Sequence, residues 1–148
     1  MKSTLALVSA LAIALGLSTA SAASAAAKFT VRVKVVGTCA VKANGLEFGT
    51  YQGSPVSKSG VAQVRCTKGM PYSVSLEGGN AVRTMSLSGN PVATINYQLK
   101  LDGADARGNV TGTGSSGARV LTVLGTIPGS QNPVPGEYTD SVTMTVNY

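Results

Sequence analysis

The segment Lys28–Val36, in which apolar and polar residues alternate, most constrains what this chain can fold into. Because successive side chains of a β-strand point to opposite faces, the alternation predicts a strand with one apolar and one charged face. The apolar positions are Phe29, Val31, Val33 and Val35, and the polar positions are Lys28, Thr30, Arg32 and Lys34. Full burial of four such apolar side chains would contribute roughly 6 to 12 kcal/mol gross. This face needs a cover, and we expect another copy of the same chain to provide it.

The chain begins with the features of a secretory signal peptide. Met1-Lys2 precedes an apolar run from Leu5 to Leu17, and small residues with an Ala-x-Ala pattern follow. Cleavage could follow Ala22, Ala25 or Ala27, and we favour Ala22, which assigns residues 1–22 to the signal peptide. The apolar run is too short to span a bilayer comfortably, and no later segment approaches spanning length. We therefore expect an exported protein with no transmembrane segment in the mature chain.

The two cysteines, Cys39 and Cys66, fit an oxidising compartment. An isolated pair in an exported chain is most simply a disulfide. The loop that it closes would stabilise the fold by about 3.5 kcal/mol in the chain-entropy model. The alternative, a metal site with two cysteine ligands, lacks any histidine to complete it.

The formal net charge is +6, but the positive residues form no basic cluster. Lys28, Arg32 and Lys34 alternate with apolar residues, as on a solvated strand face, where lysine also discourages unwanted edge pairing. Few aromatic residues accompany them, so nucleic acid is a poor candidate partner. Attraction to anionic cell surfaces would be loose and nonspecific.

After Ala27 the sequence predicts an all-β sandwich, because short alternating runs are separated by turn residues and no helical pattern appears. Gly, Ser and Pro residues after Tyr51 predict a loop through Gly60, and the Gly-, Thr- and Ser-rich stretch from Asp102 to Gly117 predicts a long mobile one. The expected strands after the first are Cys39–Lys42, Val61–Cys66, Tyr72–Leu76, Arg83–Leu87, Ile95–Leu101, Val120–Ile127 and Tyr138–Tyr148.

The last expected strand places five apolar residues on one face: Tyr138, Val142, Met144, Val146 and Tyr148. Asp140 falls on the same side near the strand start, where we expect it to accept a hydrogen bond from a turn amide. An immunoglobulin-like sandwich normally adds one further strand, and no residues after Tyr148 supply it. One missing strand and one spare N-terminal strand indicate that strands are exchanged between subunits.

Motifs for catalysis or cofactor binding are absent or misleading. Without histidine, general base catalysis by histidine and pH switching by histidine are excluded, and the six carboxylates form no marked pair. Gly112-Thr-Gly114-Ser-Ser-Gly117 matches a dinucleotide fingerprint, but the residues after it favour a strand rather than a phosphate-binding helix. Asp102-Gly-Ala-Asp105 lacks the ligands of a calcium loop, and Asn109-Val-Thr111 matches a glycosylation sequon by pattern only. We expect no enzyme, no cofactor and no metal.

Four motifs in order resemble the spore coat protein U domain family, which includes pilins of the archaic (Csu-type) chaperone–usher pathway. The first is the alternating strand before the first cysteine, and the second is Leu46-Glu-Phe-Gly-x-Tyr51. The third is Val-x-Cys66-x-x-Gly69-x-Pro-Tyr72, and the last is Gly136-x-Tyr-Thr-Asp140-x-Val-x-Met-x-Val-x-Tyr148. The resemblance covers essentially the whole mature chain.

The resemblance implies an incomplete immunoglobulin-like β-sandwich that a donor strand from a neighbouring subunit completes. Residues 23–38 would be the donor extension, with Phe29, Val31, Val33 and Val35 as anchors, and residues 39–148 would be the domain whose last strand borders the acceptor groove. The implied partners are neighbouring pilin subunits, a periplasmic chaperone and an outer-membrane usher.

The expected function is that of a non-enzymatic subunit of a cell-surface fimbria that serves adhesion and biofilm formation. Two alternatives stay open: a monomeric secreted binding module, and a spore or cell-coat structural protein with the same fold.

Overall fold

A computed structural model describes residues 22–148 of the chain. Contacts divide it into an N-terminal unit that ends at Lys34 and a compact unit, Val35–Tyr148, that contains every strand. The signal peptide assigned to residues 1–22 lies almost wholly outside the described residues. The described residues contain no helix, and so none that could cross a membrane.

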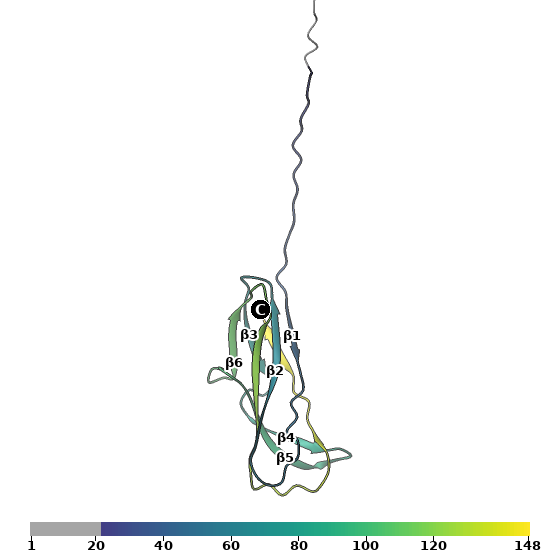
Figure 1. Cartoon of the computed structure of the whole chain (residues 1–148), viewed down its shortest axis with the longest axis vertical. Coiled ribbons are helices and arrows are strands. Elements are labelled where there is room, and N and C mark those ends of the chain that lie inside the picture. Colours follow the sequence, from purple (N-terminus) through teal and green to yellow (C-terminus); the bar gives the residue numbers. More distant parts are fainter. Residues whose placement is uncertain (1–21) are drawn as a thin grey trace, which may run out of the picture. The chain divides into compact units, whose positions relative to one another are not determined.

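The compact unit is a sandwich of two antiparallel sheets (Figure 1), as the sequence predicts. The first sheet has the strand order β1-β2-β7-β5-β4-β8, and the second has the order β6-β3-β9. The strands are β1 (Cys39–Ala43), β2 (Val56–Cys66), β3 (Pro71–Leu76), β4 (Val82–Leu87), β5 (Asn90–Leu101), β6 (Asn109–Thr113), β7 (Arg119–Ile127), β8 (Tyr138–Thr139) and β9 (Met144–Asn147).

The core lies between the sheets and is built from alternate residues of the long strands. In β2 from Gly60 and in β5 from Ile95, every second residue is buried, which is the period expected for strands with one face on a core. Val64 from the first sheet and Val74 from the second are the largest fully buried side chains. The other buried apolar residues are Ala62, Cys66, Tyr72, Leu76, Ile95, Tyr97, Leu99, Leu101, Val110, Leu121 and Ile127.

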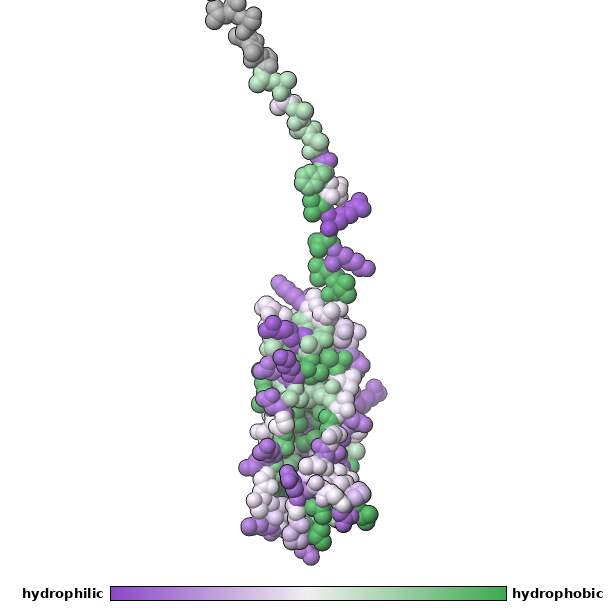
Figure 2. Space-filling view, turned by 90° about the vertical axis from the view of Figure 1, so that its right-hand side faces the viewer, coloured by the Kyte–Doolittle hydropathy of each residue, from purple (hydrophilic) through white to green (hydrophobic). Residues whose placement is uncertain are grey.

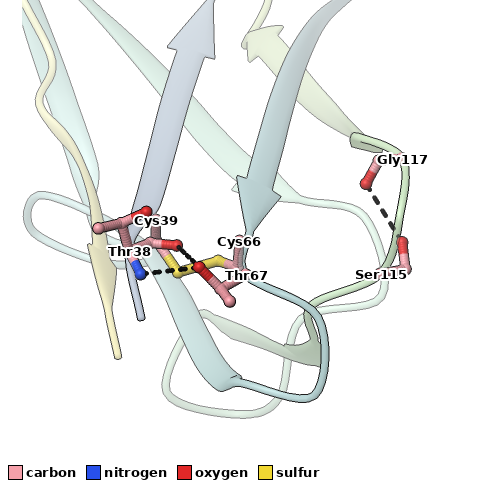
Figure 3. Close-up of a disulfide and its surroundings, with 6 residues drawn as sticks. All are labelled: Thr38, Cys39, Cys66, Thr67, Ser115 and Gly117. Atoms are coloured by element: carbon pink, nitrogen blue, oxygen red, sulfur yellow. Dashed lines mark hydrogen bonds between the residues drawn. A yellow bond between two sulfur atoms is a disulfide. The ribbon is translucent and has the colours of Figure 1, made fainter. Parts of the chain in front are cut away.

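The disulfide between Cys39 and Cys66, expected from the sequence, is confirmed. It joins directly opposed residues of β1 and β2 (Figure 3). Beside it, the backbone N–H of Thr38 donates to the Thr67 hydroxyl at 3.0 Å, and the Thr67 N–H donates to the Thr38 carbonyl at 2.9 Å. These bonds hold the start of the edge strand β1 against a central strand.

Two expected loops were wrong in part. The loop expected through Gly60 ends at Pro55, and residues 56–60 are the first half of β2, which pairs with β7 from Val56 onward. The stretch from Asp102 to Gly117, expected to be one long loop, contains β6, which pairs with β3 and buries Val110. Glycine there serves close backbone approach: a Cβ at Gly114 would overlap the carbonyl oxygen of Thr67 and lie 2.9 Å from that of Cys66.

The last strand is also not continuous. β8 pairs with β4 in the first sheet, whereas β9 pairs with β3 in the second. The residues between them, 140–143, therefore carry the chain from one sheet to the other. The alternation of side chains along 138–148 is the same for one strand or two, so the sequence pattern cannot reveal this break.

The close approach at Gly114 predicts a position-specific loss of stability. Gly114→Ala should lower the free energy of unfolding by about 1 to 3 kcal/mol, because the added methyl group has no room against the Thr67 carbonyl. Gly117→Ala is the matched control, since nothing lies within 4 Å of a Cβ there. Denaturant titration of both variants measures the difference, and equal stabilities would contradict the placement of β6.

Candidate strand-binding groove

Two strand edges that face each other are unpaired among the described residues. β1 ends the first sheet beside β2, and β9 ends the second sheet beside β3. β1 and β9 approach to within 8 Å between Cα atoms, but no ladder joins them. An edge strand presents a row of free N–H and C=O groups, so this side of the sandwich can accept another strand.

A groove of about 1050 Å³ lies in this part of the domain and begins where β1 ends and β9 starts, at Ala43 and Met144. Its floor consists of core side chains from both sheets: Leu76, Met85, Ile95, Tyr97, Leu99, Val123 and Ile127. Its rim is formed by residues 43–51, which connect β1 to β2, and by residues 133–142, which lead into and out of β8. The groove therefore opens onto the hydrophobic core itself.

The first rim segment is irregular but firmly held. Phe48 packs edge-on against Tyr97, with ring centroids 6.0 Å apart, and a Cβ at Gly125 would meet the Phe48 ring at 2.8 Å. The Tyr51 hydroxyl donates to the Pro128 carbonyl at 2.9 Å and accepts the Gln131 N–H at 3.1 Å. These contacts explain the apolar and aromatic positions of the Leu46–Tyr51 motif.

The second rim segment is tied to the core through Asp140. The Tyr97 hydroxyl, from the groove floor, donates to Asp140 Oδ2, and the Ser141 N–H donates to Asp140 Oδ1 at 2.7 Å. Further along, the Glu77 N–H donates to the Thr143 carbonyl at 2.8 Å. The hydrogen bond expected from a neighbouring backbone amide to Asp140 is therefore present, and Tyr97 is a second partner that the sequence did not indicate.

Burial, followed by the hydrogen bond and the charge of Asp140, raises the pKa of Tyr97 well above its usual value. The phenol therefore stays protonated and remains a donor through the physiological range. Its bond to Asp140 fixes where the chain crosses from β8 to β9.

Three of the five apolar residues expected at the groove, Tyr138, Val142 and Met144, line it. Val146 packs against the core but does not line the groove, and Tyr148 is 63% exposed. Sequence reasoning missed Tyr97 and Phe48 as groove residues. A signal for Phe48 existed in the Leu46–Tyr51 motif, but nothing local marks Tyr97.

The N-terminal segment forms no strand or helix within residues 22–38. Its expected anchors Phe29, Val31, Val33 and Val35 are between 77% and 88% exposed. Figure 2 shows hydrophobic side chains along one side of the segment before β1 and hydrophilic ones along the other.

The Tyr97–Asp140 bond predicts a pH-dependent contribution to stability. Because the pKa of Tyr97 is raised in the folded state, this contribution is present below pH 10 and declines above it, where the unfolded chain releases the phenol proton. Tyr97→Phe should lower the free energy of unfolding by about 1 to 2 kcal/mol at pH 8 and less at pH 10.5. Denaturant titrations at both pH values measure this loss in the free energy of unfolding. Tyr148→Phe, on an exposed side chain, is the control, and equal effects of the two variants would contradict the assignment.

Comparison with known proteins agrees with this geometry. The Spore Coat Protein U domain matches residues 25–145, and no curated protein matches the chain. Among solved structures, the chain resembles one described as the CsuC–CsuE chaperone–tip adhesion subunit pre-assembly complex from archaic chaperone–usher Csu pili of Acinetobacter baumannii. The identity is 23% and the TM-score 0.54, over 77% of this chain and 40% of the matched chain, so the likeness concerns the fold. The family match spans most of the sequence, and the chain belongs to the Spore Coat Protein U domain family.

Proposed function

We propose that this chain is a structural subunit of a chaperone–usher pilus, polymerised by strand donation between neighbouring subunits. In this assembly residues 23–38 of one subunit enter the groove of the next, and Phe29, Val31, Val33 and Val35 turn toward its apolar floor. The observation that carries the proposal is the pairing of an uncovered alternating segment with a groove that opens onto the core.

The hydrophobic effect favours residues 23–38 of a neighbouring subunit as the occupant of the groove. Transfer of four large apolar side chains from water into the groove would contribute roughly 6 to 12 kcal/mol gross. The segment would also pair its backbone with the free edge of β9, as in other cases of β-strand addition. Such a contact joins two different surfaces of the same chain, so it extends into a filament rather than closing into a dimer.

The remaining partners follow from the same groove. An exported subunit with an open core needs temporary cover before assembly, which a periplasmic chaperone would supply and an outer-membrane usher would exchange for the next subunit. The similar solved structure is described as a chaperone–subunit complex of this pathway, which supports the proposal. The signal peptide, the disulfide and the lack of histidine fit an exported structural protein at the cell surface, with adhesion and biofilm formation as its role.

Deletion of residues 23–36 should remove the ability of the chain to donate a strand but leave its groove able to accept one. The chain lacking these residues should not polymerise, yet it should bind a synthetic peptide of residues 23–36 in a one-to-one complex with a higher melting temperature. The mature chain should form multimers that electron microscopy and size-exclusion chromatography detect. If the shortened chain is an equally stable monomer without peptide and the mature chain never polymerises, strand donation is wrong and a monomeric binding module is favoured.

Charges at the expected anchors should stop assembly without affecting export. Val31→Lys with Val33→Lys should abolish fibres, because two ammonium groups would have to enter an apolar groove. Thr30→Lys is the matched control, since it places the same group on the opposite face of the segment. Electron microscopy of cells and immunoblots of periplasmic extracts are the two measurements. Normal fibres from the double variant would contradict the assignment of the anchors.

A further inference from the structure

The charges at the groove rim are all of one sign. Glu47 in the first rim segment and Glu137 and Asp140 in the second line the groove, and all three are exposed. No lysine or arginine is among the residues that line it. Half of the six carboxylates in the chain therefore lie at this one groove, although the protein as a whole is basic.

The N-terminal segment has the opposite charge. Lys28, Arg32 and Lys34 occupy its polar face, and no carboxylate occurs between residues 22 and 38. When the apolar face of such a strand turns into the groove, the polar face points outward, toward the rim and solvent. Lysine and arginine can lay their aliphatic stems along the rim while their charged ends meet carboxylates there.

We propose that the acidic rim selects the cationic N-terminal segment of a second copy of this chain, so that the subunit preferentially polymerises with itself. This inference depends on the proposed function and adds the identity of the occupant to it. The apolar anchors would provide most of the affinity, because exposed ion pairs contribute little stability. The charges would speed the encounter and disfavour donor segments that carry carboxylates on the same face.

The experiment measures how fast labelled peptides of residues 23–36 bind the full mature chain that carries Val31→Lys with Val33→Lys, which should not fill its own groove by polymerising, at 20 mM and at 500 mM salt. The charge-reversed peptide carries Lys28→Glu, Arg32→Glu and Lys34→Glu. At low salt its association rate constant should be lower than that of the native peptide by about tenfold or more, and high salt should largely remove the difference. The reciprocal chain, Glu47→Lys with Glu137→Lys, should reverse this preference. Asp140 is left unchanged, because it holds Tyr97.

Controls separate the failure of this inference from the failure of the proposed function. Gln63→Lys, Gln98→Lys and Asp102→Lys in the mature chain raise the net charge by the same four units as the reciprocal chain, at exposed positions that do not line the groove, and should not reverse the preference. The Val31→Lys, Val33→Lys peptide tests apolar docking alone.

If native and charge-reversed peptides bind equally fast, or if the reciprocal chain does not reverse their order, the inference is overturned while strand donation stands. If the native peptide does not bind, or binds no better than the Val31→Lys, Val33→Lys peptide, both fail.

Discussion

The side of the sandwich between β1 and β9 governs the rest of this structure. Each of these strands pairs on one edge only within residues 22–148, and a groove lined by core side chains begins at their ends, Ala43 and Met144. Free backbone groups therefore lie next to an apolar groove, and each offers interactions that an added strand can make. One additional strand with alternating apolar residues would satisfy both, and a segment with this alternation precedes the first cysteine of the chain.

The other features of the domain keep this groove in shape. The disulfide and the Thr38–Thr67 hydrogen bonds hold the short edge strand β1 to β2. Phe48 and Tyr51 hold the first rim segment against the core, and the Tyr97–Asp140 bond holds the second. A preformed groove reduces the ordering cost when a strand binds, because the receiving side chains are already placed.

Specificity and affinity are divided between different residues in the proposed assembly. The apolar anchors would drive docking, but many alternating segments offer apolar anchors of similar size. Charge is the property that distinguishes the segment Lys28–Val36 from a generic strand, and the acidic rim is its counterpart. A subunit that recognises its own extension in this way fits a repeated element of a fibre.

The sequence by itself determined the all-β class, the disulfide, most strand positions and the two-faced N-terminal segment. These depend on local periodicity, on turn residues and on the chemistry of an isolated cysteine pair, all of which are readable without long-range contacts. Only the tertiary structure decided that β6 lies within the glycine-rich stretch, that the chain changes sheets at residues 140–143, and that Phe48, Tyr97 and three carboxylates gather at one groove. The reason is physical: strand pairing and convergence on a groove join residues far apart in the chain, and side-chain alternation is the same whichever sheet a strand enters.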